Sequence, residues 1–540
     1  MAALFTTPKR NDNTSGAHFA EPDARRRTLL AHGSWRRVTR RIVVGAVCAL
    51  TASSLLMPSV SLAAEWVDVD GVRHEAAAGP TGDAAGTWSW NGADDMKLNG
   101  YNGGEIKAEG KLNVNYEGNN TVTNDNGCGI SVTKDTNGNA ELNIQGDASS
   151  TLNVTSSSDA IWSEGDINID GAGTVNATST EGDAIDANEN LTIKGGGKVE
   201  ASSIKEAAIW ADGGITISGG SQVKASSQED IAVDAEGSLT VTNASLNASG
   251  VDYGVYGRKG VTLDHATVTV RASAGGGWQT IALITDEDDI VIKNGSIVDA
   301  FAEGEFSAAI STRNYDPNGA GGHIYISDSV VKAIARYAET GGDGPDHYSG
   351  DQNDEIVPEH RGMNLGIFAQ TEKGITPATI SIIRSRVTAE GDTAAIFALA
   401  MSEDGKAIGT IEIEGALIQT PTGGKVIDYR YEQEYSRSIV YEAGQTIGTG
   451  DATIDSPYDQ AVSKSVVIVP PEEAKPEEKP GETKPEGTKT TKTVAVAAMG
   501  AKTTDKLAAT GDASGAVVVA TALAGTAAIA AGAVVSRKRS

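Results

Sequence analysis

A repeat in the middle of the chain constrains the fold more than any other feature of the sequence. Four similar segments follow one another at steps of 24 residues, beginning at Gly165, Glu189, Gly213 and Gly237. Columns of apolar residues recur at nearly the same period, for example Ile161, Ile185, Ile209, Val233 and Val255. Three short apolar runs per repeat, separated by Gly, Asn, Asp and Ser, are typical of a β-solenoid.

One repeat shows how such a coil would be built. Leu191 and Ile193 alternate with polar residues, so each short run places one face inward. The glycines Gly195–Gly197 supply the backbone conformations that a tight corner needs. The sequence therefore predicts an all-β fold, a right-handed parallel β-helix of about 24 residues per coil, over residues 111–469. The alternative is an antiparallel sandwich, but hairpin proteins repeat strand by strand rather than in three distinct columns.

The beginning of the chain is predicted to be a signal peptide, residues 1–63. Seven arginines between Arg25 and Arg41 precede an uncharged stretch from Ile42 to Leu62. The small residues Ser61 and Ala63, at the minus-three and minus-one positions, place the cleavage site after Ala63. The pair Arg36–Arg37 raises twin-arginine export as an alternative, but the residues that follow favour general secretion. We therefore expect an exported protein.

Charge and cysteine content agree with export. The 44 Lys and Arg against 72 Asp and Glu give a formal net charge of −28, and loss of residues 1–63, with nine basic and three acidic residues, makes it −34. Such a surface disfavours nucleic acid as a partner and suits divalent cations or solubility. Only Cys128 remains after cleavage, so no intramolecular disulfide can form, and we interpret it as a buried small residue rather than a nucleophile.

Residues 64–110 are predicted to form an N-terminal cap because aromatic residues concentrate there ahead of the repeats. After the regular block, insertions lengthen the coils, and the longest runs from about Glu339 to Arg361. Its acidic residues make it a weak candidate for a calcium-binding loop, although a solvated acidic loop is the simpler interpretation. The candidate ligands are Asp343, Asp346, Asp351, Asp354 and Glu355. No other cofactor is expected, and the two histidines of the loop match no zinc motif.

One column of residues is a candidate ligand-binding surface. The residue after each apolar position of the Ile161 column would point outward, and these residues are Trp162, Asp186, Trp210, Asp234 and Tyr256. Sugar rings stack on aromatic faces and sugar hydroxyls bind carboxylates, so this column is a possible glycan-binding surface. Asp186 and Asp234 would lie about 9.6 Å apart, near the spacing of inverting glycosidases, but catalysis also needs an acid in a cleft. A generic exposed surface column is the simplest alternative.

The C-terminal part of the chain changes composition abruptly. Residues 470–506 are rich in Pro, Glu, Lys and Thr, which predicts an extended spacer without a core. Residues 507–540 then hold a short motif, an uncharged apolar run and a basic end. The run contains a predicted transmembrane helix at 516–535, and Arg537, Lys538 and Arg539 would stop its transfer across the membrane.

The motif, apolar helix and basic tail together resemble the cell-wall sorting signal of surface proteins from Gram-positive bacteria. The motif here is Leu507, Ala508, Ala509, Thr510 and Gly511, with Ala508 where the usual motif has proline. It is therefore similar to the variant handled by one sortase class in high-GC Gram-positive bacteria. The resemblance implies cleavage between Thr510 and Gly511 and transfer of Thr510 to peptidoglycan. The alternative is an uncleaved transmembrane anchor.

The two ends of the chain thus indicate a solenoid displayed on a cell surface. A non-catalytic adhesin or glycan-binding protein, anchored by sortase to peptidoglycan, is the function we expect. The alternatives are a pectinase-like or lyase-like enzyme acting on polysaccharide, and a structural surface protein without a specific ligand.

Overall fold

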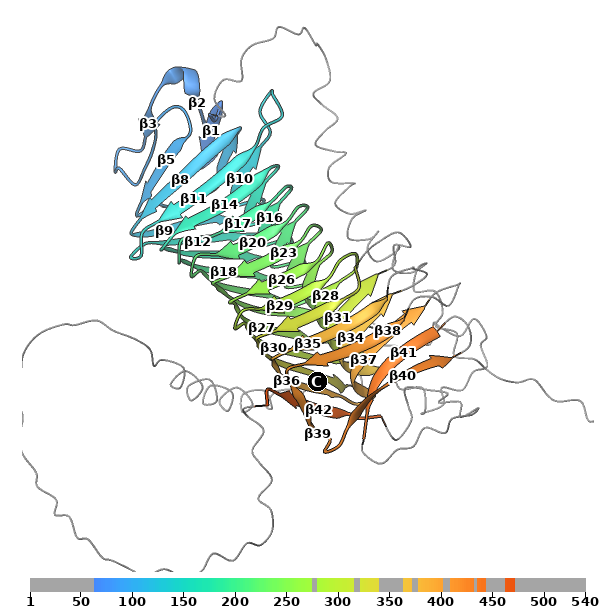
Figure 1. Cartoon of the computed structure of the whole chain (residues 1–540). Helices are drawn as coiled ribbons and strands as arrows, with labels where there is room; N and C mark the ends of the chain where they lie inside the picture. Colours follow the sequence, from blue (N-terminus) through green and yellow to red (C-terminus); the bar gives the residue numbers. More distant parts are fainter. Residues whose placement is uncertain are drawn as a thin grey trace, which may run out of the picture. The chain divides into compact units, whose positions relative to one another are not determined.

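Three long sheets of mostly parallel strands make up the folded part of the chain (Figure 1). The computed structural model describes residues 63–273, 279–314, 321–338, 363–371, 377–401, 408–431, 435–442 and 462–471. The chain divides into two units between Lys475 and Pro476, and every described residue belongs to the first. The described residues are nearly all in strands or turns, as expected, with a single three-residue 3-10 helix at Ala76–Ala78.

We name the sheets A, B and C, and the chain visits A, C and B in turn. Sheet A contains β3 (Thr81–Gly82), β4 (Trp88–Trp90), β5 (Asp95–Asn99), β8 (Lys111–Glu117), β11 (Glu141–Gly146), β14 (Asp166–Gly171), β17 (Leu191–Ile193), β20 (Ile215–Ser218), β23 (Leu239–Thr242), β26 (Val261–Asp264), β29 (Ile290–Lys293), β32 (Ile324–Ser327), β35 (Ala378–Ile383) and β38 (Gly409–Glu414). Sheet B contains β1 (Trp66–Val69), β2 (Val72–Glu75), β7 (Ile106–Glu109), β10 (Ile130–Thr133), β13 (Ile161–Ser163), β16 (Ile185–Ala187), β19 (Ile209–Ala211), β22 (Val233–Ala235), β25 (Tyr253–Gly257), β28 (Thr280–Thr285), β31 (Ser307–Asn314), β34 (Asn364–Thr371), β37 (Ala394–Met401), β40 (Lys425–Tyr431) and β41 (Tyr435–Tyr441). Sheet C contains β6 (Asn102–Gly103), β9 (Asn119–Asn124), β12 (Thr151–Ser156), β15 (Thr174–Ser179), β18 (Lys198–Ser203), β21 (Gln222–Ser227), β24 (Ser245–Val251), β27 (Thr267–Ser273), β30 (Ile297–Gly304), β33 (Val330–Tyr337), β36 (Arg386–Gly391), β39 (Leu417–Thr420) and β42 (Ser465–Val469).

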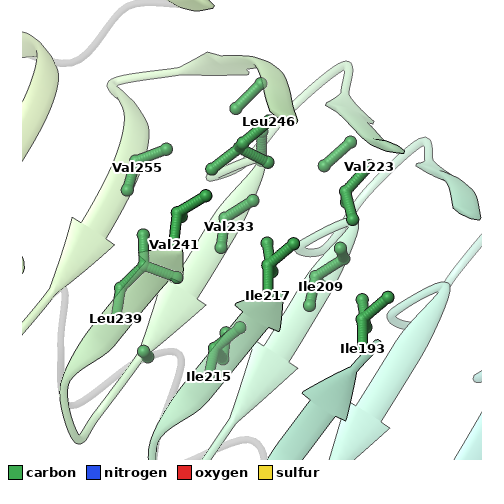
Figure 2. Packing of buried hydrophobic residues seen from close by; sticks show 14 of the residues in the cluster. Ile193, Ile209, Ile215, Ile217, Val223, Val233, Leu239, Val241, Leu246 and Val255 are labelled. Carbon is green, nitrogen blue, oxygen red and sulfur yellow. The ribbon is translucent and has the colours of Figure 1, made fainter. Parts of the chain in front are cut away.

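The apolar columns seen in the sequence are in register in the structure. In sheet B, Ile161 pairs with Ile185 and Ile185 with Ile209, each pair 24 residues apart. In sheet C, Val199 lies between Val175 and Val223 in the same way. All of these side chains are buried in one continuous core. Figure 2 shows part of this core, including Ile209 and Val223. The parallel, coil-on-coil stacking predicted from the period is therefore confirmed.

The corners between sheets depend on glycine where two coils approach closely. Gly195 has φ of +90°, and a Cβ atom there would lie 2.3 Å from the backbone nitrogen of Gly171 in the preceding coil. Both the left-handed backbone and the missing side chain are needed at this point. The corner glycines are thus a condition for stacking at full contact.

The parallel array is shorter at its C-terminal end and longer at its N-terminal end than the sequence predicts. β5, β6 and β7 lie within the expected cap, residues 64–110, yet they pair in parallel with β8, β9 and β10 as a first coil. At the other end, the expected parallel helix to Val469 is wrong, because β41 pairs antiparallel with β37 and β42 antiparallel with β36. The physical reason is that the last coil has open edges, and reversed strands cover them.

Antiparallel strands therefore cap both ends of the solenoid. At the N-terminal end, β1 pairs antiparallel with both β2 and β7, and β4 with β3 and β5. The aromatic residues Trp88, Trp90 and Tyr101 are buried here and close the core, as the sequence suggested. The part of the chain that is described contains no helix long and apolar enough to cross a membrane. The predicted helix at 516–535 lies outside the described residues.

Candidate functional site

The candidate site lies on the outer face of sheet B. Strands β13, β16, β19, β22 and β25 follow one another in this sheet, and their central outward residues are in register. These residues form a line that we call the outer ladder, consisting of Trp162, Asp186, Trp210, Asp234 and Tyr256. The structure thus brings together the five residues that the sequence analysis proposed as a column.

Local sequence explains why each strand presents a single outward side chain in its centre. In β13, Ile161 and Ser163 are buried on either side of Trp162, which is partly exposed. A serine hydrogen bond between coils fixes the corner before β16, β19 and β22. Ser203 Oγ donates to the carbonyl oxygen of Gly182 in the preceding coil at 2.7 Å and accepts the N–H of Glu206 at 3.2 Å. The strands that carry the outer ladder are therefore placed by bonds between coils.

The outer ladder is exposed only at its N-terminal end. Trp162, Asp186 and Trp210 are partly exposed, whereas Asp234 is 5% exposed and Tyr256 4% exposed. The expectation that all five residues face solvent is therefore wrong. The part that a ligand can reach consists of the first three, which we call the exposed ladder.

The burial of Tyr256 has a clear cause in the later coils. From β25 onwards the outer face of sheet B becomes apolar, and Tyr256 belongs to a second hydrophobic cluster with Ile284, Phe368 and Phe397. The Tyr256 ring stacks on Tyr253 with centroids 6.0 Å apart, and its hydroxyl donates to Asp286 at 3.1 Å. A tyrosine held in this way is part of the fold rather than a free contact surface.

Two aspartates that were not singled out in the sequence stand three residues before the first two ladder residues. Asp159, before Trp162, is partly exposed, and Asp183, before Asp186, is buried at 3% exposure. Carboxylate oxygens of Asp159, Asp183 and Asp186 all lie within 4.8 Å of one another. The backbone N–H of Asp183 donates to Asp159 Oδ1 at 2.9 Å. The repeated pattern Asp-Ala-Ile, 24 residues apart, was a signal that could have revealed these two residues.

The three carboxylates have the ligand chemistry that calcium prefers. Calcium takes about six to eight oxygen ligands, so one oxygen from each of three side chains forms only part of a coordination shell. The loop that the sequence named as a weak calcium candidate, Asp343, Asp346, Asp351, Asp354 and Glu355, lies outside the described residues.

Cys128 lies beside this carboxylate group, with its Sγ 3.8 Å from Asp159 Oδ2. Burial, together with the negative charge of Asp159, raises the pKa of the Cys128 thiol to about 12. The thiol therefore stays protonated at neutral pH, and a protonated thiol is a poor nucleophile.

A polar column borders the exposed ladder on its other side. Glu164, Asn188 and Asp212 follow the inward residues of β13, β16 and β19, and all three are partly exposed. Asp212 also accepts a hydrogen bond from Trp210 Nε1 at 3.1 Å, which orients that indole ring. The site is thus a strip of two indoles and a carboxylate with hydrogen-bonding groups along its edges.

No protein-family model, no curated protein and no solved structure matches the chain. The proposed sorting motif Leu507–Gly511 and the basic residues Arg537–Arg539 lie outside the described residues. Ala63, the predicted cleavage site, is the first described residue and forms a bridge with Lys111. The features that bear on function are therefore the geometry of sheet B and the sequence of the two ends.

Proposed function

We propose that this chain is a non-catalytic glycan-binding protein displayed on the outside of a Gram-positive cell. In this proposal the solenoid is the binding module, residues 470–506 are a stalk, and Leu507–Gly511 is the site of attachment to peptidoglycan by a sortase. We also infer that the coil is right-handed, because parallel strands connected within one sheet are right-handed in nearly all folds.

The observation that carries the proposal is the exposed ladder. Two partly exposed tryptophans with a carboxylate between them stand in register on one face of a regular sheet. An indole face stacks on the C–H face of a sugar ring, and a carboxylate accepts hydrogen bonds from sugar hydroxyls. A strip that spans three successive coils suits a polymer rather than a single sugar.

The arrangement of carboxylates favours binding over hydrolysis. The pair Asp186 and Asp234, two coils apart, would have the spacing of an inverting glycosidase. Asp234 is buried, at 5% exposure, so it does not reach a glycan lying on the exposed ladder. This is why we propose a binding protein rather than the polysaccharide-active enzyme that the fold also permits.

A glycan array probed with the full chain tests the proposal. Binding to polysaccharide ligands without release of reducing sugar is the expected result. If the wild-type protein bound no glycan, the proposed binding function would be wrong. If it hydrolysed a bound polysaccharide, the non-catalytic assignment would be wrong.

A further inference from the structure

We propose that the exposed ladder binds a neutral, linear, β-1,4-linked polysaccharide whose chain runs along the stack of coils. This inference rests on the proposed glycan-binding function and names the class of glycan. Alternate sugar rings would lie on Trp162 and Trp210, and the ring between them would face Asp186. The spacing, the edges and the charge of the strip each support this class of ligand.

The spacing of the two indoles is set by the sheet. Trp162 pairs with Asp186, and Asp186 pairs with Trp210, so the tryptophans are separated by two strand spacings. Neighbouring strands lie about 4.8 Å apart, which places the two residues about 9.6 Å apart. This matches the length of one disaccharide in an extended β-1,4-linked chain. Successive sugars in such a chain are flipped, so the same face recurs once per disaccharide.

The edges of the strip fit the shape of such a chain. Sugars of the gluco configuration carry equatorial hydroxyls, so their flat faces are apolar and their rims are polar. The indoles occupy the centre of the strip, while Asp159 lies on one side and Asn188 and Asp212 on the other, all partly exposed. Flat faces can therefore meet indoles while rim hydroxyls meet amide and carboxylate oxygens.

The charge of the strip selects against acidic polysaccharides. The partly exposed Asp159, Asp186 and Asp212 lie on or beside it, and the whole chain has a formal net charge of −28. Bringing the carboxylates of a polyuronate against this surface would place like charges close together, which is costly. The expected ligand is therefore neutral, whether its sugars are plain or N-acetylated.

The test measures dissociation constants of the full chain for defined oligosaccharides. Cellohexaose and N-acetylated chitohexaose are the two test ligands, because both have a β-1,4-linked backbone. Maltohexaose is the α-linked control, and polygalacturonate is the acidic control. We expect the β-1,4-linked hexaoses to bind, and to bind more tightly than their disaccharides, because only a longer chain reaches both indoles. The α-linked and acidic controls should bind at least about tenfold more weakly.

Variants test whether the two indoles act at this spacing. W162A and W210A should each lose about tenfold in affinity for the hexaose, the size expected for one lost aromatic contact. Y325A is the matched control, because Tyr325 is an aromatic residue 37% exposed on the outer face of sheet A. Y325A should bind as the wild type does.

The sharpest variant is D186W/W210D, which keeps composition and charge but moves the second indole one coil closer to Trp162. Its rings would be about 4.8 Å apart, so it should bind the hexaose no better than W210A. Wild-type affinity in this variant, or equal binding of maltohexaose, would overturn the inference. If array glycans bind but W162A and W210A leave that binding unchanged, this inference fails while the proposed function stands. If no glycan binds at all, both fail.

Discussion

Asp252 turns the chain from β24 into β25 with a left-handed backbone, at φ of +63°. Its Oδ1 atom is buried and has no hydrogen-bond partner among the described residues. Burial raises the pKa of the Asp252 carboxyl to about 6. The pKa of an aspartate carboxyl in the unfolded chain is about 3.9. The neutral Asp252 carboxyl therefore stabilises the folded state fully below pH 4, and this stabilisation is lost as the pH rises through 6.

We therefore predict that D252N is more stable than the wild type at pH 8, by about 2 kcal/mol, and equal to it near pH 4. Asparagine also tolerates the left-handed backbone at this position. Urea unfolding at the two pH values measures the difference. D328N is the control, in which the change in the free energy of unfolding should have the opposite sign. Asp328 also has a positive φ, but Arg384 lowers the pKa of its carboxyl. The prediction would be contradicted if the difference in free energy of unfolding between D252N and the wild type were the same at pH 4 and pH 8.

The inward column of sheet A gives a second residue-scale prediction. Ile193 and Ile217 are in register and buried, at 1% and 0% exposure, and both lie in the core shown in Figure 2. I193D or I217D would place an unpaired charge in a dry interior, so each should lower the free energy of unfolding by about 3 to 5 kcal/mol. T216D, on the outward face of the same strand β20, should change it by less than about 1 kcal/mol. A loss at Thr216 as large as the loss at Ile217 would contradict this assignment of inward and outward residues in β20.

At the scale of the elements, the C-terminal cap covers a sheet edge that would otherwise be free to pair with another chain. β42 covers β36 through antiparallel pairing, and its residues Val466 and Ile468 are fully buried. V466K/I468K should detach this strand and leave an open edge of sheet C, which is a template for pairing with another chain. We predict concentration-dependent self-association, measured by light scattering. V467K changes the neighbouring, half-buried residue of the same strand and should remain monomeric. If V467K associated as strongly as V466K/I468K, the added lysine charge rather than the exposed sheet edge would be the cause of self-association.

The elements also show how far sequence reasoning reaches. The strands of the regular block could be placed residue by residue, because a strict period fixes which side chains must face the core. The caps could not, since reversed strands such as β41 and β42 occur once and leave no period to detect. The candidate site was only half predictable for a similar reason. The line of ladder residues follows from the repeat, but the burial of Tyr256 depends on contacts with Tyr253, Ile284 and Asp286, which have no counterpart in the regular block.

At the scale of the whole molecule, the proposed anchor makes a prediction from the sequence of the C-terminal end. If a sortase cleaves between Thr510 and Gly511, T510A should stay in the membrane fraction with its tail intact, because the acyl donor residue is changed. The wild type should be released by muramidase and end at Thr510. Mass spectrometry of the two fractions measures this. Deletion of Arg537–Ser540 is the companion variant and should let the protein leak into the medium, since the stop-transfer charges are lost. A wild-type chain that still ends at Ser540 in the membrane would show an uncleaved anchor.

The position of β42 has a mechanical consequence for a chain tethered at its C-terminal end. β42 is the last strand among the described residues, directly before the proposed stalk, and it lies between β36 and β39, bonded antiparallel to both. Any tension from the tether therefore enters the fold through this one strand and loads two rows of hydrogen bonds at once. Drag on all the coils is transmitted through this strand, so the tension is greatest there. In the proposed tethered protein we therefore expect flow across the cell surface to open the C-terminal cap first and to leave the exposed ladder of sheet B in place.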